Sequence, residues 1–166
     1  MIIRCTQKLI KELRIKPTEI DALNPMTSWH ANVLRIDRRK CVLFIHDQSL
    51  FSVFVAGLKR SDFDRLDEVF GQAMFRTLRL FDFDQRQVEQ LLDWGRHNSY
   101  TKTNSRSVLG SMNDMALHLQ HHIAYEGGLS SVDLDGLHLR INQIFFSAIG
   151  SYYPWQKLKS LLNGDG

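Results

Sequence analysis

The spacing of apolar residues changes once along this 166-residue chain, near residue 60, and that change most constrains its fold. Before it, apolar runs at residues 1–5, 28–36, 41–45 and 50–55 have the length and composition of strands. After it, apolar residues return every three or four positions, as on one face of a helix. The sequence therefore predicts an α+β domain, with a small, mainly antiparallel sheet from the N-terminal third covered by several helices from the rest of the chain.

Capping and helix-breaking residues predict where the helices begin. The expected starts are Ser61, Asp84, Ser105 or Ser107, Ser131 and Pro154. The long helix from Ser105 or Ser107 is expected to reach Tyr125, before a pair of glycines. The final helix, residues 154–163, is expected to dock on the rest of the chain, so that residues 1–166 form one domain.

Residues 37–40 are expected to form the turn of a hairpin between the strands at 28–36 and 41–45. Basic side chains cluster there, at Arg35, Arg38, Arg39 and Lys40. Such a hairpin tip is either a solvated turn or a surface that follows phosphates. Residues 100–103 are expected to be a short extended piece.

Charge and cysteine content favour a soluble protein of a reducing compartment. The 21 basic and 18 acidic residues leave a net charge of +3, which permits an anionic partner without demanding one. Cys5 and Cys41 lie in apolar contexts and are expected to be free, buried thiols. No apolar run has the length of a membrane span, and no signal peptide is recognisable. The cytoplasm is the expected location, without a membrane association.

The most unusual segment surrounds the start of the long helix. Polar and cationic side chains gather there, at Lys102, Asn104, Ser105, Arg106, Ser107 and Ser111. The free N–H groups and positive dipole end of a helix, flanked by two cations, make a site for a phosphate or a carboxylate. The simpler interpretation is helix capping, for which one of these residues is enough.

Two polar residues of the strand at 28–36 form a second candidate. Because side chains alternate along a strand, His30 and Asn32 share one face and Trp29 lies on the other. His46 and Asp47 end the partner strand, so a histidine–aspartate general base can form there. The alternative is that His30 and Asn32 are the solvated face of the sheet.

Histidines at residues 118, 121 and 122 follow Asp114 on the long helix. His118 and His121 lie on the side away from the apolar stripe, which favours solvated side chains. A zinc-protease motif is absent, because no Glu follows His118. We therefore expect no metal site and no cofactor.

Three motifs carry a resemblance to a known family: residues 3–9, Trp29–Asn32, and 103–114. The chain resembles a family of uncharacterised bacterial proteins, a domain of unknown function, to about Gly150. The resemblance implies a bacterial cytoplasmic protein. It brings no activity, cofactor or catalytic residue.

The sequence thus favours a non-enzymatic module that binds an anionic ligand at the start of the long helix. Nucleic acid, a nucleotide or an acidic protein segment would suit this site. A small phosphoester hydrolase or nuclease is the first alternative, with His30 or His46 as base and Arg106 near the developing charge. A protein-interaction component, such as a toxin–antitoxin partner, is the second.

Overall fold

Five strands form one mixed sheet in the part of the chain that the computed structural model describes, residues 1–20, 24–150 and 152–164. The strands are β1 (Ile2–Cys5), β2 (Ser28–Ile36), β3 (Arg39–His46), β4 (Ser52–Leu58) and β5 (Ser99–Lys102). Their order is β4-β3-β2-β1-β5. Strands β2, β3 and β4 are antiparallel, whereas β1 is parallel to both β2 and β5. The predicted α+β class with a mainly antiparallel sheet is confirmed.

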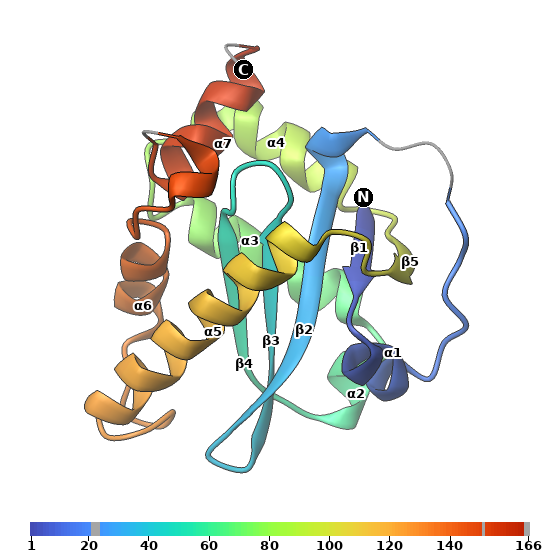
Figure 1. Ribbon diagram of the computed structural model, residues 1–166, viewed down its shortest axis with the longest axis vertical. Coiled ribbons are helices and arrows are strands. Elements are labelled where there is room, and N and C mark those ends of the chain that lie inside the picture. The colour runs from blue at the N-terminus through green and yellow to red at the C-terminus, as the bar shows by residue number, and fades with distance from the viewer. Residues whose placement is uncertain (21–23, 151, 165–166) are drawn as a thin grey trace.

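Helices cover both faces of this sheet (Figure 1). The first face carries α1 (Gln7–Leu13), α2 (Arg60–Phe63), α3 (Leu66–Leu78), α4 (Gln85–Trp94) and α7 (Pro154–Asn163). The second face carries α5 (Arg106–Tyr125) and α6 (Leu134–Ile141). Two 3₁₀ turns, η1 (Pro25–Thr27) and η2 (Ser147–Ile149), lie in the connections.

The alternation of side chains along the strands divides the core in two. Trp29 and Phe44 point to the first face, where both contact Phe70 of α3, with ring centroids 5.2 and 4.1 Å away. Leu34 and Leu43 point to the second face, under α5 and α6. Leu158 of α7 is fully buried in the first core, so this last helix is part of the packed structure.

The caps expected for three helices are present. Asp84 and Gln87 bond each other's backbone amides at 2.8 and 3.0 Å and open α4. Ser105 caps α5, and Pro154 is in the first turn of α7. Two expected starts were wrong: α2 begins at Arg60, after Lys59, whose amide donates to Asp62 Oδ2 at 2.8 Å, and Asp133 rather than Ser131 caps α6 by accepting from the Asp135 amide at 3.1 Å.

Two further differences concern the strands. The expected turn at 37–40 is only two residues long, since Asp37 and Arg38 both adopt positive φ, 48° and 63°, and β3 begins at Arg39. The extended piece expected at 100–103 is β5, which pairs with β1. The sheet therefore takes one strand from beyond the N-terminal third, because the N-terminal strand has a free side that a second parallel strand can pair with.

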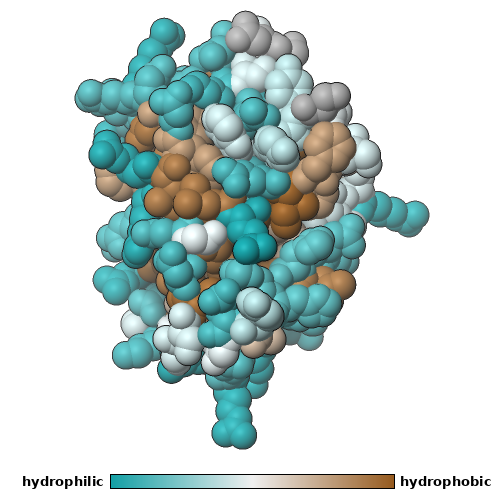
Figure 2. All heavy atoms as spheres, turned by 90° about the vertical axis from the view of Figure 1, so that its left-hand side faces the viewer, coloured by the Kyte–Doolittle hydropathy of each residue, from teal (hydrophilic) through white to brown (hydrophobic). Residues whose placement is uncertain are grey.

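Apolar side chains also reach the surface. Phe75, Leu117, Tyr125 and Phe145 are each at least 46% exposed. Figure 2 shows the side on which α6 lies, where apolar patches are divided by hydrophilic atoms. Among the described residues, no helix combines the length and apolar character needed to cross a membrane.

Candidate functional site

The carboxyl ends of β1 and β5 lie side by side at the same edge of the sheet. The two strands are parallel, with Cys5 opposite Lys102 at their ends. The helices that follow them leave in opposite directions: α1 packs Leu9 into the first core, and α5 packs Val108 into the second. In sheets that contain parallel strands, a divergence of this kind opens a crevice where ligands commonly bind.

The α5 amino end gathers most of the residues that the sequence singled out. Ser105 accepts a hydrogen bond from the Val108 amide at 3.3 Å, and its carbonyl accepts one from Leu109. Within the described residues, the amides of Arg106 and Ser107 have no acceptor, as expected for the first turn of a helix. The exposed members of the set are Lys102, Asn104, Arg106 and Ser107.

Ser111 lies one helical turn after Ser107 and is half-buried. The Ser105 side chain provides one capping hydrogen bond, and the rest of the helix end faces solvent. The amino end is therefore open to a ligand, which is the condition that an anion site requires.

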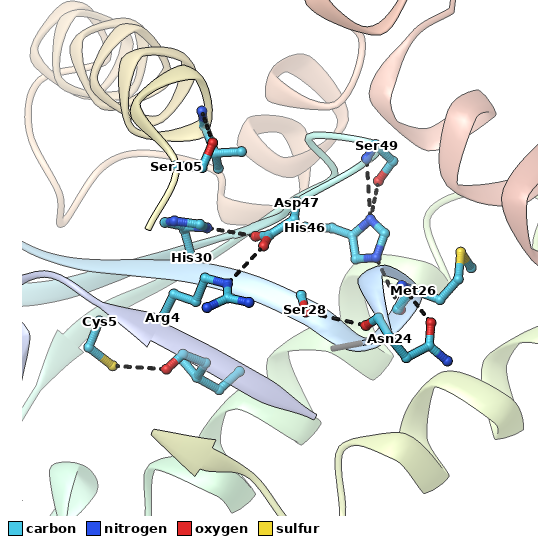
Figure 3. Close-up of polar contacts among 12 residues, drawn as sticks. Arg4, Cys5, Asn24, Met26, Ser28, His30, His46, Asp47, Ser49 and Ser105 are labelled. Atoms are coloured by element: carbon cyan, nitrogen blue, oxygen red, sulfur yellow. Dashed lines mark hydrogen bonds and ion pairs between the residues drawn. The ribbon is translucent and has the colours of Figure 1, made fainter. Parts of the chain in front are cut away.

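His30 is buried and Asn32 is half-buried, and both side chains have hydrogen-bond partners within the fold. His30 is fully buried, and its Nδ1 donates to Asp47 Oδ1 at 2.7 Å. Arg4 of β1, also buried, donates from Nε to the other oxygen of Asp47 at 3.3 Å. Figure 3 shows both basic side chains directed at this one carboxylate. Asn32 Oδ1 accepts from the Thr6 hydroxyl at 2.7 Å, which links β2 to the start of α1.

The sequence did not single out Arg4 of this cluster. The sequence feature that could have identified Arg4 is its charge, because it stands between the apolar residues Ile3 and Cys5 in a strand of mostly buried side chains. A fully buried arginine almost always has a charged partner, so Arg4 by itself predicts a nearby carboxylate. His30 Nε2 is buried without a hydrogen-bond partner among the described residues.

His46 lies in a different environment from the one expected for a general base. Its Nε2 donates to the Met26 carbonyl at 3.1 Å, and its Nδ1 accepts from the Ser49 hydroxyl at 2.9 Å. Burial lowers the pKa of His46 to about 4, against weaker opposing effects of the Met26 carbonyl and the Asp47 charge. The ring is neutral and fully engaged, so it holds the β3–β4 connection together.

A groove of about 350 Å³ lies between α1 and β2. Its lining is largely cationic and comprises Lys8, Lys11, Glu12, Val33, Leu34, Arg35 and Lys40. The sequence had placed Arg35 and Lys40 in a hairpin cluster but gave no reason to join them to the lysines of α1. Only the packing of α1 beside β2 brings these side chains together.

The histidines of α5 line another groove, of about 490 Å³, with Tyr125, Arg140, Ile141 and Ile144 beside them. His118 and His121 are exposed, as expected for a solvated helix face. In the described part of the chain, no three His, Cys, Asp or Glu residues are placed to hold a metal ion.

Both cysteines are free and buried. Burial raises the pKa of the Cys5 thiol to about 12. A thiol with such a pKa is protonated and unreactive near neutrality.

Comparison with known proteins adds a family but no activity. A family model described as a domain of unknown function (DUF6933) matches residues 2–157. No curated protein and no solved structure matches the chain.

Proposed function

We propose that this chain, which belongs to the DUF6933 family of domains of unknown function, has a non-enzymatic role. It binds an anionic group at the carboxyl ends of β1 and β5. The observation that carries this proposal is the divergence of α1 and α5 to opposite faces after two neighbouring parallel strands (Figure 1). In sheets with parallel strands, ligands commonly bind at such a point.

The chemistry at this edge suits a phosphate or a carboxylate. The positive end of the 20-residue helix α5 is exposed, and two of its amides have no acceptor among the residues that the structure describes. Arg106 supplies a planar donor pair for two anion oxygens, and Lys102 supplies a mobile positive charge. The carboxylate of Asp47 is already bound to Arg4 and His30.

The geometry favours binding over hydrolysis. A general base must reach the proton that it removes, and both histidines considered for that role are fully buried. His46 uses both ring nitrogens inside the fold, and His30 uses Nδ1 on Asp47. We therefore assign Arg106 and Lys102 to ligand binding without an attached reaction.

Substitution of Arg106 by Ala tests the proposal. We expect the affinity for a fluorescein-labelled single-stranded oligonucleotide or Glu-rich peptide, measured by anisotropy, to fall about ten- to a hundredfold, because one charge-assisted contact is worth roughly 1.5–3 kcal/mol. With the oligonucleotide, the slope of log affinity against log salt should shrink by about one.

The preferred probe distinguishes a phosphate ligand from a carboxylate ligand. Arg86→Ala is the control, because Arg86 is an exposed arginine in the first turn of α4. If Arg106→Ala binds both probes as tightly as the unsubstituted protein does, the proposed site is wrong.

A further inference from the structure

Strand β2 extends well beyond its neighbour β1. β1 pairs with residues 28–31 of β2 and then ends, because Thr6 turns the chain into α1. Among the strands of the described chain, the remainder of β2, residues 32–36, pairs only with β3, on its other side. One edge of the strand is therefore open over its second half.

Two hydrogen bonds establish which backbone groups face this open edge. The Ser28 carbonyl accepts from Asp47 beyond β3, and the Ala31 carbonyl accepts from Thr6 beyond β1, both at 3.0 Å. Because the direction of backbone groups alternates along a strand, even-numbered residues of β2 bond toward β3 and odd-numbered residues away from it. The N–H and C=O groups of Val33 and Arg35 thus point to the open edge, and within the described residues they have no partner.

The groove between α1 and β2 runs beside these backbone groups and is strongly cationic. Its lining holds four basic side chains and one acid, Glu12, which Lys40 neutralises through a 2.7 Å ion pair. Lys8, Lys11 and Arg35 are exposed, and no ion pair occupies them among the described residues. An incoming strand would meet three positive charges at once.

Parts of the other two edges of the sheet have hydrogen-bond partners. On β4, the Asn142 side chain bonds both the amide and the carbonyl of Ser52, at 2.7 and 2.9 Å, and His138 accepts from the Phe54 amide at 3.0 Å. On β5, the Tyr100 carbonyl accepts from Thr18 at 2.8 Å. An exposed strand edge is a template for pairing with another chain, so the open part of β2 stands out.

We propose that this edge binds an extended acidic segment of a partner protein, which adds to the sheet as a strand beside residues 33–35. A peptide backbone has both the acceptors and the donors that Val33 and Arg35 need, whereas a nucleic-acid phosphate has acceptors only. Carboxylates at alternate positions of the segment pair with Lys8, Lys11 and Arg35. The interaction extends beyond the anion site proposed above and does not use Arg106.

Nuclear magnetic resonance of the full chain tests this interaction directly. The probe is a synthetic peptide of alternating Glu and Val with blocked ends, and its counterpart carries Lys in place of Glu. We expect the acidic peptide to slow hydrogen exchange of the Val33 and Arg35 amides at least tenfold. Binding without this protection, or equal binding of the two peptides, would overturn the proposal, as would protection by an oligonucleotide alone.

Two variants separate the charges from the backbone. K8E/K11E should weaken peptide binding about tenfold or more, while the matched variant Arg86→Glu should not, since Arg86 and Lys8 are both exposed second residues of their helices. Val33→Pro should abolish binding, because it removes an N–H on the open edge and leaves the β2–β3 hydrogen bonds in place. Unchanged affinity of K8E/K11E contradicts the proposal even if Val33→Pro fails to fold.

Arg106→Ala distinguishes this inference from the proposed function. Protection of Val33 and Arg35 should persist in that variant. Persistence together with unchanged oligonucleotide affinity would refute the anion site alone, and loss of protection would refute the strand edge as an independent site.

Discussion

A single carboxylate holds two buried basic residues from neighbouring strands. Asp47 accepts from Arg4 and from His30, at 3.3 and 2.7 Å, although only 16% of its own side chain is exposed. Taking two such groups out of water is unfavourable unless they are paired, so the three side chains act as one unit. The trio stabilises the β1–β2–β3 part of the sheet.

Replacement of Asp47 by Ala should destabilise the protein strongly. Both basic groups would stay buried without their acceptor, which costs roughly 3–5 kcal/mol when a buried pair is broken. Urea denaturation measures this loss. Asp64→Ala is the control, because it removes only an exposed pair with Arg60 and should cost less than about 1 kcal/mol. Equal effects of the two variants would show that Asp47 has no special role.

At the scale of elements, helix α6 protects the outer edge of the sheet with side chains instead of a strand. Asn142 is fully buried and pairs with both backbone groups of Ser52. His138 donates from Nδ1 to the Leu134 carbonyl at 2.8 Å, and its Nε2 lies 3.0 Å from the Phe54 amide nitrogen and 3.1 Å from the Phe54 carbonyl oxygen. In the sequence, these two residues are only polar positions one turn apart, and their role depends on how α6 packs on β4.

Asn142→Ala should cost about 2–4 kcal/mol in urea denaturation, because two buried backbone groups of Ser52 lose their partner. It should also promote self-association through the uncovered edge of β4, which light scattering detects. Asn113→Ala, at an exposed position of α5, should change stability by less than about 0.5 kcal/mol. If Asn142→Ala changed the free energy of unfolding no more than Asn113→Ala does, the hydrogen bonds of Asn142 to the β4 edge would not contribute to stability.

At the scale of the whole molecule, one sheet separates two cores, and buried titratable groups connect their packing to pH. Burial lowers the pKa of both His46 and His138, so the folded state resists protonation that the unfolded chain accepts. Burial raises the pKa of Cys5 to about 12, so the folded state also resists loss of that proton. The pKa shifts of the histidines and of Cys5 have opposite directions, so the protein is most stable in a pH range that lies between them.

We expect the free energy of unfolding to fall as pH drops from about 6.5 toward 4. The unfolded chain binds more protons in this window, and His46 alone accounts for roughly 3 kcal/mol. Above about pH 9, stability should fall again as the unfolded Cys5 ionises.

Denaturation at a series of pH values measures both limbs. His46→Gln should flatten the acid limb, since it keeps a donor for the Met26 carbonyl and does not titrate. Cys5→Ala should flatten the alkaline limb. An acid limb of unchanged slope in His46→Gln would contradict the assignment to His46.

Local patterns predicted much of the fold and part of the candidate site. The spacing of apolar residues along the chain distinguished strands from helices, and Ser105 was an expected cap of α5. Strand alternation placed His30 and Asn32 on one face. These features depend on residues a few positions apart, whose relation is set by backbone geometry.

Long-range features could not be predicted in this way. Nothing local pairs β5 with β1, which lies almost a hundred residues earlier, and nothing local joins Lys8 and Lys11 to the free edge of β2. The sequence by itself determined the type and approximate position of most elements and the faces that each presents. Only the tertiary structure decided which elements are neighbours, because that choice depends on burying both apolar faces of one sheet at once. The resulting arrangement of neighbours created the divergence of α1 and α5 and the open edge of β2.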